Sequence, residues 1–144
     1  MNDRWLHPDP VAMPCHGLSQ GLFTDFYQLT MAQAYWQNDK TAKATFSLFF
    51  RKYPPGRGYF VFAGLGDILN YLCNLQFTES DLNYLRSTDI FHDGFLNYLG
   101  NFRFTGNIRA MAEGTLFFRN EPVLEVTAPI IEAQIVETML VNQV

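Results

Sequence analysis

The segment 22–36 constrains the fold more than any other part of this chain, because it combines a helix start with an apolar repeat. Thr24 is a good N-cap, since its hydroxyl can accept a hydrogen bond from an unpaired N–H of the first turn. Asp25 follows at the positive end of the helix dipole, where a carboxylate is stabilised. Apolar residues then recur with the spacing of an amphipathic helix, at Tyr27, Met31, Ala34 and Tyr35. We therefore predict a helix over about 24–37, ended by residues 38–40.

The middle of the chain alternates between strand and helix patterns. Residues 44–50 alternate as a strand does, with Phe46, Leu48 and Phe50 on one face. Two prolines and two glycines in 53–58 then exclude a regular element, before a short strand at 59–63. The spacing of apolar residues predicts three helices, over about 65–75, 78–86 and 91–100. The second of these begins with a capping-box pattern, Thr78 to Asp81.

The final third returns to strands and ends in a helix. We predict strands at 107–112 and 115–119 around a tight turn at Glu113–Gly114, and a further strand at 123–127. Pro129 suits the first turn of a last helix. That helix carries an apolar stripe at Ile131, Ile135, Met139 and Leu140. This order of elements predicts an α+β domain with helices against a largely antiparallel sheet.

The same patterns divide the chain into three parts. Residues 1–20 contain several prolines and show neither period, so we predict an irregular lead-in segment. Residues 21–128 form the α+β domain, and residues 129–144 start a helix that leads out of it. This last helix reaches Val144 with no glycine and no cap. Because a self-sufficient domain normally closes its final element, we expect the chain to be truncated.

Composition and charge exclude several classes of protein. With 48% apolar and 17% charged residues, the chain is of the globular rather than the disordered class. A formal net charge of −4 argues against a general nucleic-acid binder. No apolar run approaches the ~20 residues that span a bilayer, and the first residues lack the apolar region of a signal peptide. We expect a cytoplasmic protein that binds neither nucleic acid nor membrane.

The cysteines and histidines do not form a recognisable site. Cys15 and Cys73 form no C-x-x-C pair, and reduced thiols are the better interpretation. His7, His16 and His92 lack the spacing of metal ligands, so no metal site is predicted. We expect His92 to be a surface residue at a helix start.

Six short segments occur in an order that identifies a family. The string T-D-x-Y-Q-x-T-M-A-x-A-Y covers 24–35, and a strand running into a basic loop covers 46–59. Shorter matches follow at 63–65, 102–106, 113–114 and 132–142. Together they resemble the N-terminal portion of the nicotinate phosphoribosyltransferases, which make nicotinate mononucleotide for NAD synthesis.

The resemblance implies a fold and an activity. Family members, which are type II phosphoribosyltransferases, carry an N-terminal α/β domain beside a larger α/β barrel, and this chain ends before the barrel. The enzymes form nicotinate mononucleotide and pyrophosphate from nicotinate and phosphoribosyl pyrophosphate with ATP hydrolysis, and Mg²⁺ is implied. The barrel supplies the histidine that ATP phosphorylates. We therefore expect no catalytic residue here, an inactive fragment, and a homodimer whose site is shared between subunits.

Three substrate-binding residues follow from the resemblance. It implies that Tyr27 stacks on the pyridine ring from the neighbouring subunit and that Asp25 shapes the ring pocket. It also implies that Arg51 contacts phosphate, which suits the bidentate geometry of a guanidinium group. Each also has a plainer explanation. Tyr27 could be a core residue, Asp25 could complement the charge of the helix dipole, and Arg51 could be a solvated residue at the end of a strand. The family's helix E-T-x-L-x-N matches Glu137 and Asn142, which we leave without a role.

Two alternatives to this function remain. The chain can be read as a non-catalytic module that binds a small molecule or dimerises. It can also be read as a nicotinamide or quinolinate phosphoribosyltransferase relative, because stacking recognises the ring more than its substituent. The nicotinate pattern of residues 24–35 and 46–59 favours a nicotinate phosphoribosyltransferase over both alternatives.

Overall fold

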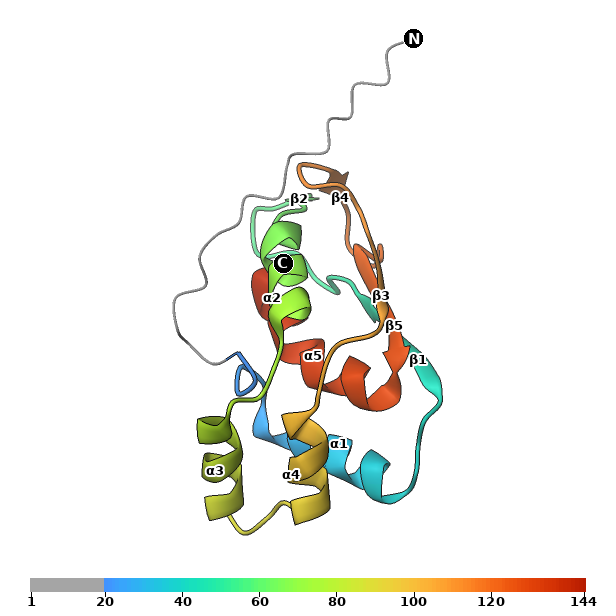
Figure 1. Cartoon of the computed structure of the whole chain (residues 1–144). Coiled ribbons are helices and arrows are strands. Elements are labelled where there is room, and N and C mark those ends of the chain that lie inside the picture. Colours follow the sequence, from blue (N-terminus) through green and yellow to red (C-terminus); the bar gives the residue numbers. More distant parts are fainter. Residues whose placement is uncertain (1–19) are drawn as a thin grey trace.

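A three-stranded antiparallel sheet packs against the helix that follows it, and this helix lies at the centre of the molecule. The computed structural model describes residues 20–144 (Figure 1). The sheet has the order β1-β5-β3, formed by Lys43–Leu48, Leu124–Pro129 and Asn107–Ala110. Its register places Val126 between Phe46 and Ile108. The prediction of an α+β fold with an antiparallel sheet is confirmed.

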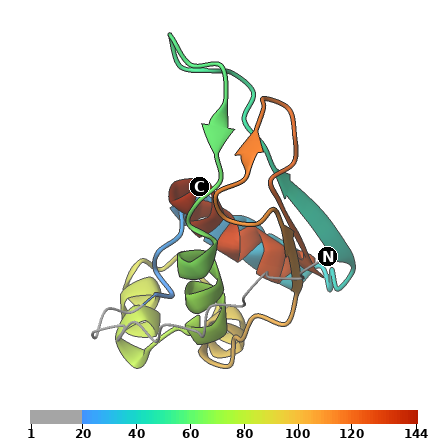
Figure 2. The same ribbon diagram turned by 90° about the horizontal axis from the view of Figure 1, so that it is seen from above.

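Helix α5 (Ile130–Gln143) is the most buried element. Eight of its 14 residues are buried, and it contacts α1, α2, β1 and β5. Figure 2 shows α5 in the middle of the fold, with the sheet along one side. The predicted stripe is buried, and so are Ala133 and Val136 on other faces. A helix that is apolar on most sides packs in the core. α5 is therefore an integral part of this core. That it leads into a further domain remains a prediction.

Helix α1 (Phe26–Gln37) lies against α5, and two predictions about it are wrong. The N-cap is Asp25 rather than Thr24. The buried residues are Gln28, Leu29 and Ala32, whereas Tyr27 is 49% exposed. In the predicted stripe, Met31 and Ala34 are exposed and Tyr35 is partly buried. Apolar residues occur on every side of α1, so the position of α5 decides which side is buried, and local spacing cannot show that.

Three shorter helices follow the predictions closely. They are α2 (Leu65–Asn74), α3 (Glu79–Ser87) and α4 (Asp93–Gly100). The predicted capping box is confirmed: the Thr78 N–H donates to Asp81 Oδ2 at 2.7 Å, and the Asp81 N–H donates to Thr78 Oγ1 at 3.3 Å. His92 is the exposed N-cap of α4, and its Nδ1 accepts from the Gly94 N–H at 3.1 Å. The expectation of a surface helix-start histidine is confirmed.

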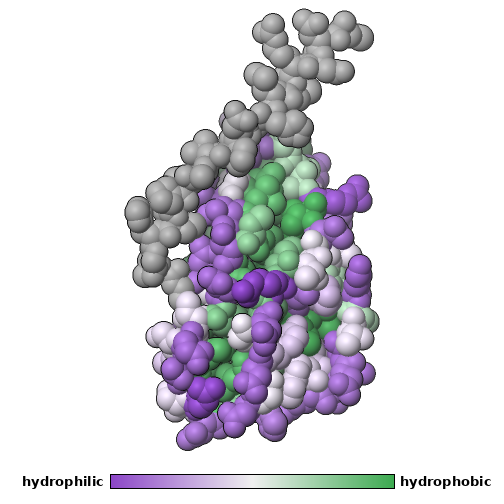
Figure 3. Space-filling view, in the orientation of Figure 1, coloured by the Kyte–Doolittle hydropathy of each residue, from purple (hydrophilic) through white to green (hydrophobic). Residues whose placement is uncertain are grey.

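A two-stranded ribbon, β2 (Phe60–Val61) with β4 (Leu116–Phe117), stands beside the sheet. Its inner face is an aromatic stack, with ring centroids 4.6 Å apart for Phe50–Phe60 and 5.2 Å for Phe60–Phe117. The outer side chains Val61 and Leu116 are exposed. In Figure 3, apolar side chains gather over the upper part of the molecule, around α2 and this ribbon.

The turn at Glu113–Gly114 is present, but its flanking strands do not pair with each other. Gly114 has a left-handed φ of 82°, and its N–H donates to the Phe62 carbonyl at 2.8 Å. The turn therefore connects β3, which pairs with β5, to β4, which pairs with β2. A second small correction concerns Pro129, which is the N-cap of α5 and not part of its first turn.

Several predictions lie outside the described residues. The lead-in segment 1–20 is described only at Gln20, and Cys15, His7 and His16 fall in the part that the structure does not describe. Cys73 is exposed and free. Among the helices of residues 20–144, none has the length and apolar character needed to cross a membrane.

The Tyr71 hydroxyl of α2 generates a stability prediction. Tyr71 is 2% exposed, and its hydroxyl has no hydrogen-bond partner within residues 20–144. Since an unpaired buried hydroxyl costs about 1–3 kcal/mol, Tyr71→Phe should raise the free energy of unfolding by about 1 kcal/mol in urea titrations. The exposed Tyr84→Phe is the matched control and should change little. A loss of stability in Tyr71→Phe would contradict the prediction.

The same substitution has a pH signature. Burial raises the pKa of the Tyr71 hydroxyl, so the unfolded chain ionises this group first, near its ordinary value of about 10. The free energy of unfolding is therefore unaffected by this group below about pH 10, and it falls as the pH rises above that value. Tyr71→Phe should lose less stability than the unsubstituted chain between about pH 9.5 and 11.

Candidate functional site

The first turn of α1 is fastened to α5 by a polar network around Gln28. This side chain is 1% exposed, and its Oε1 lies 2.6 Å from Thr138 Oγ1 and 2.5 Å from Thr24 Oγ1. The Asp25 N–H donates to Thr138 Oγ1 at 3.0 Å. The Thr24 hydroxyl also lies 3.1 Å from the Ile135 carbonyl of α5. A buried amide with this many partners holds two helices in one register.

Tyr27 is held by its hydroxyl while its ring remains open. The hydroxyl donates to Glu137 Oε1 at 3.4 Å and accepts from Gln28 Nε2 at 3.4 Å. The other oxygen of Glu137 accepts from Gln134 Nε2 at 2.9 Å. Half of the Tyr27 side chain is exposed. The plainer explanation, that Tyr27 is a core residue, does not describe this position.

Asp25 belongs to the same junction. It is exposed, it is the N-cap of α1, and its Oδ2 lies 3.2 Å from the Thr138 hydroxyl. The carboxylate thus stands at the positive end of the helix dipole, as expected. The structure brings Asp25 and Tyr27 together against α5.

Arg51 lies in a different part of the molecule. It follows β1 in the loop of residues 49–58, where it is exposed. Figures 1 and 2 both place this loop, near β2, away from the first turn of α1. Asp25 and Tyr27 are therefore not brought together with Arg51 within one chain.

The segments 102–106 and 132–142 meet through a buried carboxylate. Glu132 of α5 is 6% exposed and accepts from the Thr105 N–H at 2.6 Å and from the Thr105 hydroxyl at 2.8 Å. Burial, followed by the charge of Glu132, raises the pKa of Tyr98 on α4. Two bonds from one residue fix the loop after α4 against α5. Glu132 and Thr105 therefore have a structural role.

Sequence reasoning missed three residues of the α1–α5 junction: Gln28, Gln134 and Thr138. Each is a polar residue of α1 or α5, and Gln28 and Gln134 are both buried. Gln28 also stands three residues after Asp25, the position at which a capping-box glutamine bonds back to the N-cap N–H, here at 3.3 Å. That spacing was the available signal, and assigning the N-cap to Thr24 concealed it.

The network predicts that Thr138 stabilises the docking of α1. Thr138→Val keeps the side-chain shape but leaves the Gln28 amide and the Asp25 N–H short of a partner, so the free energy of unfolding should fall by about 1–3 kcal/mol. Thr45→Val is the matched control, because its hydroxyl pairs with Thr127 on the exposed side of the sheet. Equal stability of the two variants in denaturant titrations would show that the network contributes nothing.

Comparisons with known proteins agree on one family. The sequence model described as the nicotinate phosphoribosyltransferase (NAPRTase) N-terminal domain matches residues 22–144. The chain is 52% identical over 123 residues to nicotinate phosphoribosyltransferase pncB2 of Mycobacterium tuberculosis, covering 85% of this chain and 27% of that protein. It is 48% identical over 125 residues to the Bacillus subtilis enzyme, covering 86% and 26%.

A solved structure shows the same similarity. Human nicotinic acid phosphoribosyltransferase superposes with a TM-score of 0.76 at 34% identity, covering 84% of this chain and 25% of that one. The chain thus spans about a quarter of the length of the relatives that it matches. It belongs to the nicotinate phosphoribosyltransferase family, and it corresponds to the N-terminal domain of that family's members.

Proposed function

We propose that this chain provides the nicotinate-stacking surface and part of the phosphate-binding surface of a nicotinate phosphoribosyltransferase. The whole enzyme would form nicotinate mononucleotide and pyrophosphate from nicotinate and phosphoribosyl pyrophosphate, with ATP hydrolysis. The observation that carries the proposal is the Tyr27 side chain, half exposed and anchored through its hydroxyl at the α1–α5 junction. A ring held at its tip offers a fixed face to a second ring.

The surroundings of Tyr27 support the stacking role. Phe23, Phe26 and Met31, which are near Tyr27 in sequence, are also at least 38% exposed. An apolar surface of this kind excludes water from a bound pyridine ring, and a fixed platform costs little conformational entropy on binding. Asp25, at the same helix start, would border the ring pocket.

Arg51 supports the phosphate-binding role. No ion pair involves it within residues 20–144, where Arg86–Asp93 is the one salt bridge. Its guanidinium group is therefore available for a charge-assisted, bidentate bond to phosphate. Both reactants carry negative charge, and the transition state resembles an oxocarbenium ion, so positioning and charge balance are the protein's main contributions.

The remaining chemistry belongs outside this chain. Within residues 20–144 no three His, Cys, Asp or Glu side chains are grouped to hold a metal ion. The phosphorylated histidine and the ATP site would come from the barrel. Because Tyr27 and Arg51 lie apart in one chain, a homodimer with a shared site would allow both to reach the same substrates.

The choice of nicotinate over related pyridines is supported by the relatives. Those at 52% and 48% identity are both named nicotinate phosphoribosyltransferases. No observation on the described residues favours a non-catalytic binding module.

Tyr27 can be tested in a chimera in which residues 22–144 replace the matching region of the Bacillus subtilis relative. Tyr27→Ala should raise the KM for nicotinate by about 2- to 13-fold, the equivalent of 0.5–1.5 kcal/mol of stacking. Tyr27→Phe should be mild, because the ring face is retained and the two hydrogen bonds that are lost are long, at 3.4 Å each. Steady-state kinetics and thermal unfolding are measured on both variants.

Thermal unfolding separates stacking from packing. A core tyrosine truncated to alanine loses about 3–5 kcal/mol of stability, whereas a half-exposed one should lose much less. An unchanged nicotinate KM with a large fall in melting temperature would exclude the stacking role.

Subunit mixing tests whether Tyr27 acts across the interface. Mixing Tyr27→Ala subunits with subunits that keep Tyr27 but carry an inactive barrel should restore activity. Hybrid dimers that form without recovering activity would exclude a role across the interface.

Arg51 makes a different kinetic prediction in the same chimera. Arg51→Ala should raise the KM for phosphoribosyl pyrophosphate more than that for nicotinate, since a charge-assisted contact is worth about 1.5–3 kcal/mol when partly desolvated. Arg51→Lys should recover only part of the loss, because an ammonium group lacks the planar fork. Lys40→Ala, an exposed cation before β1, is the control. An unchanged KM for phosphoribosyl pyrophosphate in Arg51→Ala would contradict the phosphate-binding role of Arg51.

A further inference from the structure

Two loops that are distant in sequence are joined beside the aromatic stack. The Asn120 N–H donates to the Phe50 carbonyl at 2.8 Å, and the Arg119 N–H donates to the Tyr53 hydroxyl at 3.1 Å. Arg51 directly follows Phe50, and Arg119 directly precedes Asn120. The hydrogen bonds therefore place the backbone of Arg119 next to the basic loop that carries Arg51.

The joined loops carry a concentration of positive charge. Arg51, Lys52 and Arg57 lie in residues 49–58, and Arg119 lies in residues 118–121; all four are exposed. None forms an ion pair within the part of the chain that the structure describes. One carboxylate, Glu121, belongs to these loops, and it accepts from the Phe118 N–H at 2.8 Å. In a chain with a net charge of −4, this end is locally positive.

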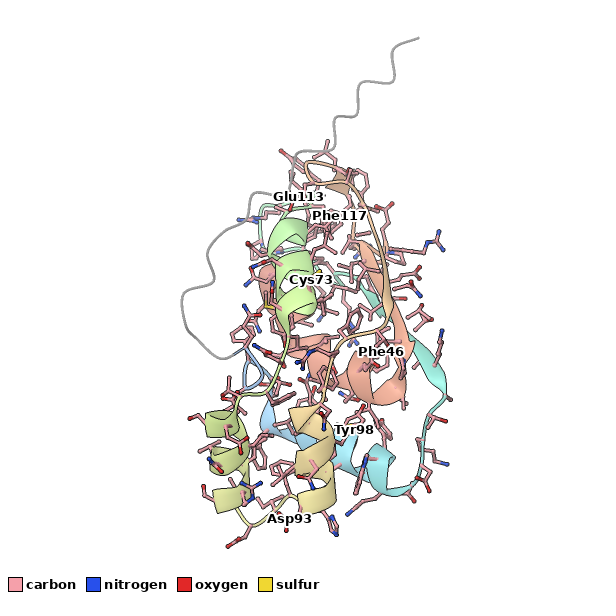
Figure 4. All side chains as sticks on the ribbon, in the orientation of Figure 1. Phe46, Cys73, Asp93, Tyr98, Glu113 and Phe117 are labelled. Carbon is pink, nitrogen blue, oxygen red and sulfur yellow. The ribbon has the colours of Figure 1, made fainter. Side chains whose placement is uncertain are left out.

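The base of this surface is fixed. Phe50 stacks on Phe60 and Tyr53 stacks on Phe60, at 4.6 and 5.3 Å between ring centroids, so the basic loop is anchored to the ribbon. A hollow of about 670 Å³ opens beside it, lined by Arg57, Gly56 and Gly58 together with Phe117. Figure 4 shows Phe117 and Glu113 at this end and Asp93 at the opposite end of the molecule.

We propose that Arg119 is a further phosphate-binding residue and that, with Arg51 and Arg57, it forms a site for a diphosphate group. The inference rests on the proposed function, to which it adds Arg119 and the class of ligand. Two guanidinium groups on adjacent backbone segments suit two linked phosphates better than a single anion, because each forms bidentate bonds to one of them. The ligand is a diphosphate ester or free pyrophosphate.

Binding of sodium pyrophosphate to the 144-residue chain tests the site directly. Titration calorimetry gives the affinity, and amide shifts of ¹⁵N-labelled protein give the location. Arg119→Gln should weaken pyrophosphate binding about 3- to 10-fold. The bond to Tyr53 uses the backbone N–H of Arg119, so this variant removes the cation and keeps the link between the loops. Arg86→Gln, which makes the same charge change on α3, is the matched control.

Localised amide shifts in residues 50–58 and 118–121, with a weakening specific to Arg119→Gln, would support the proposal. Equal affinities of Arg119→Gln and Arg86→Gln, or equal binding of pyrophosphate and sulfate, would overturn it. Absence of pyrophosphate binding to the chain would overturn it as well. The stacking role of Tyr27 is judged by nicotinate kinetics and does not depend on these results. Far-UV circular dichroism on each variant confirms that the fold is retained.

Discussion

The buried amide of Gln28 joins the start of α1 to α5, and the position of every candidate substrate residue on α1 depends on it. Its oxygen serves two threonine hydroxyls and the Asp25 N–H, and its nitrogen reaches the Tyr27 hydroxyl. An apolar residue at this position would fill the space but would fix no register between the helices. The hydrogen bonds of Gln28, inside an otherwise apolar contact between α1 and α5, thus set the direction in which the Tyr27 ring faces.

Local patterns predicted those elements whose formation depends on local physics. The alternation of Phe46 and Leu48 along β1 and the capping box at Thr78 were both correct, because they depend on backbone geometry and neighbouring side chains. The buried side of α1 was predicted wrongly and the partners of β3 and β4 were not predicted, because the packing of distant segments decides both. Spacing alone cannot choose between two apolar faces of one helix.

The same distinction applies to the candidate site. Tyr27, Asp25 and Arg51 were singled out by family motifs, and the exposure of Tyr27 and Arg51 agrees with a binding role that remains proposed. Thr138 could not be paired with α1 from sequence, since its partners Gln28 and Asp25 lie 110 and 113 positions away. Arg119 lacked any local signal, because only the hydrogen bonds of Asn120 and Arg119 bring it to the basic loop.

The late position of β5 in the chain has a consequence for how the protein is made. β5 is the central strand and pairs with β1 across more than 80 residues, as the Thr45–Thr127 contact shows. During synthesis, α1 and β1 emerge long before the segments that bury them, α5 and β5. Their apolar faces stay uncovered over this interval, and the large loop that must close before pairing slows folding. The early part of the chain is therefore open to aggregation until α5 and β5 have left the ribosome.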